Sequence, residues 1–91
     1  MTIDQLRSEI DRLDTELLRI FNRRADLALH IGELKKEQDI PVYDPNREKN
    51  IIRRMQVENT GPLDNQAIVR LFERVIDESR RLERLRTTGQ E

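Results

Sequence analysis

One charged side chain interrupts an otherwise apolar row near the start of the chain. Apolar residues recur there every three or four positions: Ile3, Leu6, Ile10, Leu13, Leu17, Ile20, Leu27, Ile31 and Leu34. Arg24 occupies the one gap in this row. A guanidinium among apolar side chains is costly unless it is paired. It can reach out to solvent, meet a carboxylate of another helix, or bind an anionic ligand through its planar fork.

A second cation, Lys35, lies on the same face of the helix that this spacing predicts. Ala28, Ile31 and Gly32 lie between the two cations on that face. At 1.5 Å per residue the two backbone positions are about 16 Å apart, so two long side chains could close on one small anion. Gly32 costs roughly 1 kcal/mol relative to alanine within a helix, which indicates a packing or site role. Lys35 could otherwise be an ordinary solvated lysine.

A third cation, Arg7, shares the flank of Lys35 but lies roughly 25 Å from Arg24 along the helix axis. A rigid helix cannot bring both arginines to the same anion. If Arg7 contributes to the site, it must therefore come from a second chain that runs antiparallel to the first.

Three polar residues near the second helix form the next candidate group: Asp44, Arg47 and Glu48. Glu48 shares a face with Ile51, so its carboxylate could point inward and accept a hydrogen bond from a hydroxyl. The alternative is an acidic first-turn residue that complements the helix dipole.

Two further candidates, Ser79 and Glu83, interrupt the apolar stripe of the last helix four residues apart. Ser79 could instead bond back to its own helix. Glu83 could instead pair with Arg80 or Arg86 at the surface.

The elements that would position these groups are three helices. The first row predicts a helix of about 34 residues, roughly 50 Å long, that ends before Pro41. Asp44 and Pro45 are typical of a helix start, and this second helix ends before Gly61. Asp64 begins the third. We therefore expect an all-α fold with one long, one short and one medium helix: a single domain over 1–91 with a helical core over 3–86 and a disordered tail over 87–91.

Composition excludes several classes of function. Seventeen basic and eighteen acidic residues leave a net charge of −1, so no nucleic acid or anionic membrane partner is expected. Without cysteine and with a single histidine, neither a metal site nor nucleophilic catalysis through a thiol is expected. No signal peptide or apolar run of membrane-spanning length occurs, so we expect a cytoplasmic protein. A helix this long in so short a chain favours self-association.

Several motifs resemble the all-helical chorismate mutase family. They are the Arg7 segment LRSEIDRLD at 6–14, RRADLA at 23–28, Gly32, Lys35, the segment PVYDPNRE at 41–48, and a serine followed four residues later by an acid. The similarity covers about residues 3 to 86. It implies three helices per protomer, an intertwined homodimer with two sites, and the rearrangement of chorismate to prephenate on the way to phenylalanine and tyrosine.

The resemblance also implies roles for the cations. Arg24 and the partner subunit's Arg7 would bind the two carboxylates of the substrate. Lys35 would donate to the ether oxygen and to a carboxylate. The rearrangement is pericyclic and needs no cofactor, because the protein has only to hold the compact dianion and stabilise charge on the breaking ether bond.

The remaining candidates follow from the resemblance in the same way. Glu48 and the backbone at Asp44 would hold the ring hydroxyl, and Arg47 with Ser79 would line the side of the ring carboxylate. Glu83 would face the ether oxygen. Many bacterial members carry glutamine at this last position, and a carboxyl group can donate there only when it is protonated.

Three other functions remain compatible with this pattern. One is an isochorismate-pyruvate lyase of the same fold. The pattern of those lyases lacks the arginine and glutamate that stand next to each other here as Arg47 and Glu48, which favours the mutase. A non-catalytic regulatory domain could act on the first enzyme of the aromatic pathway as its partner. The third is a plain helical oligomerisation domain, which would need none of these candidate site residues.

Overall fold

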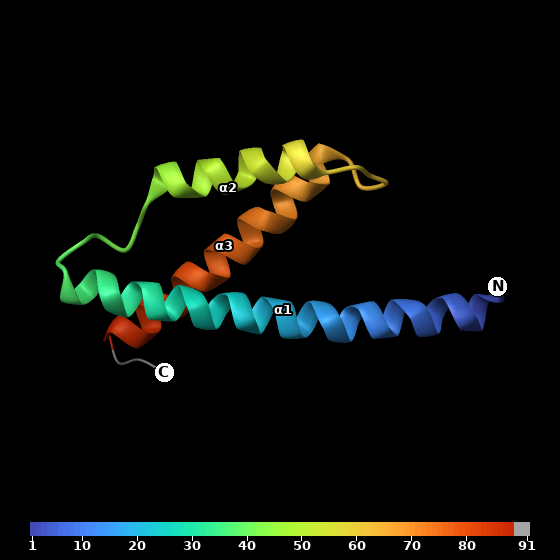
Figure 1. The fold of residues 1–91 in the computed structure, drawn as a ribbon, viewed down its shortest axis with the longest axis horizontal. Helices are drawn as coiled ribbons and strands as arrows, with labels where there is room; N and C mark the ends of the chain where they lie inside the picture. The colour runs from blue at the N-terminus through green and yellow to red at the C-terminus, as the bar shows by residue number, and fades with distance from the viewer. Residues whose placement is uncertain (89–91) are drawn as a thin grey trace.

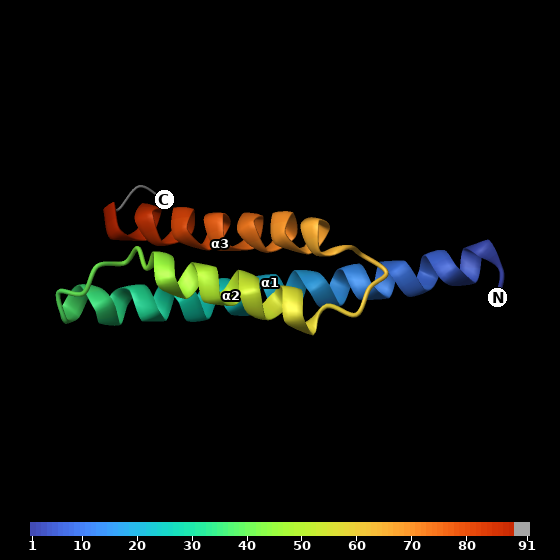
Figure 2. The same cartoon turned by 90° about the horizontal axis from the view of Figure 1, so that it is seen from above.

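The computed structural model describes residues 1–88, with side chains through Arg86, as three helices. They are α1 (Ile3–Glu37), α2 (Pro45–Glu58) and α3 (Asn65–Thr88). Helices α1 and α2 lie in one layer, and α3 crosses them in a second layer (Figures 1 and 2). Within the described residues, α3 packs against both other helices, whereas the backbones of α1 and α2 do not come within 8 Å of each other, Cα to Cα. The predicted all-α class, with a long, a short and a medium helix, is confirmed.

The end of α1 is set by a left-handed turn just before the predicted boundary at Pro41. Asp39 has φ +56°, and the amide of Ile40 donates to the carbonyl of Lys35 at 2.8 Å. Ile40 is the second residue after the C-cap, Gln38. Its bond gives a partner to the carbonyl of Lys35, which the end of the helix would otherwise leave unpaired. The chain therefore leaves α1 after Glu37 and turns toward the start of α2 (Figure 1).

Aspartate caps begin the other two helices, as predicted. The amide of Arg47 donates to the Asp44 carboxylate at 3.1 Å, and the amide of Ala67 donates to that of Asp64 at 2.8 Å. At the other end, α3 continues through residue 88, two residues beyond the predicted core boundary at 86. The rest of the predicted tail, residues 89–91, lies outside the described residues.

The protomer buries little of its apolar surface. Ile51 and Ile76, where α2 meets α3, are the hydrophobic side chains buried within the described part of the chain. The N-terminal half of α1 runs beyond the other helices (Figure 1), and its apolar row is exposed, from 46% at Leu17 to 67% at Ile3. This row is therefore open to a further packing partner. Within residues 1–88, no helix is long and apolar enough to cross a membrane.

Candidate active site

The three helices enclose a cleft of about 310 Å³, here called the central cleft. Its apolar wall is formed by Leu27, Ala28, Ile31, Val42, Ile51 and Ile76. Seven of the eight predicted site residues line it: Arg24, Lys35, Asp44, Arg47, Glu48, Ser79 and Glu83. The cleft is within the size range of small-molecule sites.

Arg24 is half-buried and donates from Nη1 to the hydroxyl of Ser79 at 3.3 Å. No carboxylate within residues 1–88 lies within ion-pair distance of it. Burial lowers the pKa of the guanidinium, and the cations Arg47 and Arg54 lower it further. Within residues 1–88, therefore, Arg24 is neither fully exposed to solvent nor paired with a carboxylate. Arg24 is a half-buried cation whose surroundings favour an added anion.

Lys35 is held at the end of the central cleft by the turn that follows α1. Its carbonyl accepts from Ile40, and its Nζ donates to the carbonyl of Val42 at 3.3 Å. The side chain is half-buried, whereas that of the adjacent Lys36 is exposed. Lys35 is thus not an ordinary solvated lysine, and its Nζ has donors to spare for a ligand.

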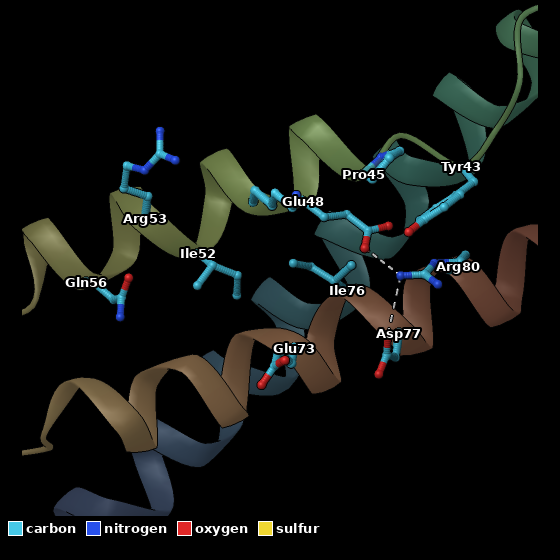
Figure 3. A pocket seen from close by; sticks show the side chains of 11 residues that line it. Tyr43, Pro45, Glu48, Ile52, Arg53, Gln56, Glu73, Ile76, Asp77 and Arg80 are labelled. Atoms are coloured by element: carbon cyan, nitrogen blue, oxygen red, sulfur yellow. Dashed lines mark hydrogen bonds and ion pairs between the residues drawn. The ribbon is translucent and has the colours of Figure 1, made fainter.

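Arg80 also lines the central cleft, and sequence reasoning missed it. We considered it only as a surface partner for Glu83, but its Nη2 donates to Oε1 of Glu48 at 2.6 Å (Figure 3). The guanidinium lies 4.9 Å from the ring centroid of Tyr43 and 3.5 Å from Asp77. One signal could have found it: Arg80 follows Ile76 by four residues and precedes Glu83 by three, which places all three on one helical face.

Glu83 extends from α3 between the central cleft and α1, where its side chain packs on Gly32. Burial raises the pKa of the Glu83 carboxyl; Lys35 and Arg80 oppose the rise, and the Glu48 carboxylate adds to it. Gly32 does not line the central cleft, although Ala28 does. Of the two roles expected for Gly32, packing or a place in the site, the structure shows packing, because the Glu83 side chain lies against it.

A second hollow, the side cleft, lies between α2 and α3 and is about 550 Å³ in volume (Figure 3). It shares Glu48, Ile76 and Arg80 with the central cleft. Its three cations face an equal number of carboxylates: Lys49, Arg53 and Arg80 against Glu48, Glu73 and Asp77. The side cleft therefore has no charge excess that would select an anion.

The charges of the central cleft, by contrast, are unequal. Its four cations are Arg24, Lys35, Arg47 and Arg80, and its three carboxylates are Asp44, Glu48 and Glu83. Asp44 caps α2 and Glu48 is paired with Arg80. Protonation of Glu83 would leave an excess of two positive charges, which suits a dianion.

Arg7 is the one predicted site residue that the protomer does not bring to the cleft. It lies on the exposed arm of α1, and the helix separates it from Arg24 by roughly 25 Å. Its predicted place in a site shared between two chains stays a prediction.

Comparison with known proteins agrees with this arrangement. The sequence profile of type II chorismate mutases matches residues 6–84. This chain belongs to the chorismate mutase type II family. The chorismate mutase of Methanocaldococcus jannaschii is 30% identical over 83 residues, which cover 88% of this chain and 82% of that protein. The bifunctional chorismate mutase/prephenate dehydratase of Neisseria gonorrhoeae is 45% identical over 87 residues, 91% of this chain. The chain spans only 24% of the length of that bifunctional relative.

Solved structures of chorismate mutases share the three-helix fold. The Thermus thermophilus enzyme, in its Form II structure, superposes with a TM-score of 0.88 at 38% identity, over 90% of this chain and 93% of that one. The Helicobacter pylori enzyme, solved in complex with prephenate, gives 0.81 at 32% identity, over 90% and 89% of the two chains. The fold of this chain is therefore that of chorismate mutases.

Proposed function

We propose that this protein rearranges chorismate to prephenate in the central cleft, as a step of aromatic amino acid biosynthesis in the cytoplasm. The observation that carries the proposal is Arg24: a half-buried guanidinium without a carboxylate partner within residues 1–88, in a cleft with excess positive charge. Chorismate and prephenate are dianions, and a relative of known structure is complexed with prephenate.

In this proposal Arg24 binds one substrate carboxylate through the face of its fork that Ser79 does not use. Lys35 donates to the ether oxygen, where negative charge grows as the carbon–oxygen bond breaks. Both groups are held before the ligand arrives, Arg24 by Ser79 and Lys35 by the carbonyl of Val42. Fixed donors stabilise developing charge without reorganisation during the reaction, and a shaped cleft holds the compact conformer of the substrate.

The other lining residues orient the ring. The Glu48 carboxylate would accept a hydrogen bond from the ring hydroxyl, and the backbone at Asp44 would donate one to it. Arg47 would face the ring carboxylate beside Ser79. Glu83, with its pKa raised by burial, would donate to the ether oxygen in its protonated form. None of these steps requires a nucleophile or a metal.

We further propose that the functional unit is a homodimer. The apolar row of α1 is exposed, and the backbones of α1 and α2 stay more than 8 Å apart within residues 1–88, which would leave space for a second long helix. An antiparallel α1 from a second copy would bury this row and bring the partner subunit's Arg7 toward the central cleft. A partner enzyme of the aromatic pathway is also compatible, since bifunctional relatives join a mutase to prephenate dehydratase.

The test is incubation of the purified protein with chorismate, with the fall in its absorbance followed and prephenate identified as the product. The same assay with isochorismate tests the lyase, which would release pyruvate. Arg24→Ala is the matched variant, and it should lose most of the activity. A wild-type protein that forms no prephenate would overturn the proposal, in favour of the lyase if isochorismate releases pyruvate and otherwise of the regulatory or oligomerisation function.

A further inference from the structure

The contact between Glu48 and Arg80 joins two helices, unlike the ion pairs within one helix such as Arg12 with Glu9. It links α2 to α3 across 32 positions of sequence at 2.6 Å. Both side chains are largely shielded, at 34% exposed for Arg80 and 26% for Glu48. A charge-assisted bond of this length in a shielded place fixes the orientation of both groups more strongly than a surface pair does.

Arg80 is itself held from two further sides. The Tyr43 ring, on the segment between α1 and α2, lies against its guanidinium, and Asp77 of α3 lies one turn before it (Figure 3). Within residues 1–88, its Nε is buried and has no hydrogen-bond partner. A buried donor left unsatisfied is unfavourable for stability. The position of this guanidinium therefore costs free energy that its bonds to Glu48 and Asp77 must offset.

The bond uses one oxygen of the Glu48 carboxylate. Arg80 donates to Oε1, and no donor within residues 1–88 lies within hydrogen-bond distance of Oε2. Glu48 lines both the central cleft and the side cleft, and in the proposed function its second oxygen would accept from the ring hydroxyl. A carboxylate held at one oxygen presents the other in a defined direction, which lowers the entropy lost when a ligand binds.

We propose that Arg80 is a positioning residue, which acts on the substrate through Glu48 and is itself oriented by Tyr43 and Asp77. The inference rests on the proposed mutase function and assigns Arg80 a role through Glu48 rather than at the reacting atoms. It predicts that the contributions of Arg80 and Glu48 to kcat/KM are not independent.

The experiment is a double-mutant cycle on kcat/KM with chorismate. Arg80→Met keeps most of the side-chain length without the charge, and Glu48→Gln keeps the shape of Glu48 without its charge. Because the glutamine oxygen can still accept from Arg80, the cycle also uses Glu48→Ala, which leaves no acceptor. We expect Arg80→Met to lower kcat/KM about 30-fold in the wild type and about twofold or less in the Glu48→Ala background. Equal losses in both backgrounds would overturn the proposal, because Arg80 would then act without Glu48.

Further variants separate positioning from charge and from folding. Arg81→Met removes the neighbouring exposed cation of α3 and should change kcat/KM less than twofold. Tyr43→Phe keeps the ring and should stay near wild type, whereas Tyr43→Leu should lower kcat/KM about threefold to tenfold. Equal activity of the two Tyr43 variants would contradict the role of the ring.

Thermal unfolding of each variant identifies any loss of folded protein, and kcat/KM is calculated from the concentration of folded protein.

The result for the wild type distinguishes this inference from the proposed function. A wild type that converts chorismate while Arg80→Met matches it overturns only the role of Arg80. A wild type that neither converts chorismate nor binds prephenate by calorimetry overturns both.

Discussion

The side chain of Glu83 lies directly over Gly32 of α1. A Cβ atom placed on Gly32 would lie 3.5 Å from both Cγ and Oε2 of Glu83. This is an ordinary van der Waals distance, so the contact accommodates a methyl group, whereas a longer side chain would displace Glu83. Gly32 is the buried residue of α1, and it sets how closely α3 brings the Glu83 carboxyl to the helix.

The first prediction follows from this contact. Gly32→Ala should raise the free energy of unfolding by up to about 1 kcal/mol, because alanine favours the helix and fits beneath Glu83. Gly32→Leu should lower it by roughly 1–3 kcal/mol through overpacking. Urea unfolding at one protein concentration measures both. Destabilisation by alanine would mean that Glu83 cannot accept even a methyl group.

The second prediction tests whether each site is built from two chains. Arg7→Ala and Arg24→Ala homodimers should both be nearly inactive, since loss of one desolvated arginine–carboxylate contact costs about 2–5 kcal/mol. A mixed dimer has one site with both arginines and one with neither. Random reassortment on refolding a mixture should therefore restore about a quarter of wild-type activity.

Two controls accompany the mixing experiment. Each variant refolded alone should stay inactive, and sedimentation should show a dimer at micromolar concentration. A fully active monomer, or no recovery on mixing, would show that Arg7 does not act across an interface.

Periodicity and capping residues were sufficient to predict the three helices. Asp44 and Asp64 cap the helices that they were expected to begin. The apolar period also predicted that Arg24 and Lys35 share one face of the first helix, and the structure places both in the central cleft. These features are local, because each depends on residues within a few turns of one helix.

What sequence reasoning missed depends on how two helices cross. Arg80 entered the sequence analysis only as a possible surface partner of Glu83, yet its long side chain reaches Glu48 on α2. For Gly32 the sequence left a packing role and a site role open, because no local pattern shows that Glu83 packs on it. Contacts between residues more than 30 positions apart follow from the crossing of the helices, which the period of one helix does not determine.

The third prediction concerns Lys35. Lys35→Ala should lower kcat about 10²- to 10³-fold while KM rises much less, because charge on the ether oxygen grows only in the transition state. Lys35→Arg should not restore kcat, since a planar fork cannot replace a point donor held by the Val42 carbonyl. Steady-state kinetics at saturating chorismate measures this. Lys36→Ala, at the exposed neighbour, is the control. An unchanged kcat with only a raised KM would assign Lys35 to ground-state binding.

The last prediction is a pH dependence governed by Glu83. Burial raises the pKa of its carboxyl, against the opposing effects of Lys35 and Arg80, and a bound dianion would raise it further. Only the protonated form can donate to the ether oxygen. Activity should therefore be present below this pKa and fall with a one-proton slope as the pH rises through it.

Glu83→Gln is the variant that tests this dependence, because its amide donates at every pH and has a similar shape. It should remove the alkaline fall in kcat between about pH 5 and 9 and raise activity at the upper end.

The same variant should change the pH dependence of stability. A carboxyl whose pKa is raised by folding contributes stability below its unfolded pKa, and this contribution is lost as the pH rises through the folded pKa. Glu83→Gln should therefore also gain stability relative to the wild type as the pH rises. Glu78→Gln, an exposed change on the same helix, is the control and should follow the wild-type profile. If the Glu83→Gln and wild-type profiles superimpose, Glu83 does not donate to the substrate.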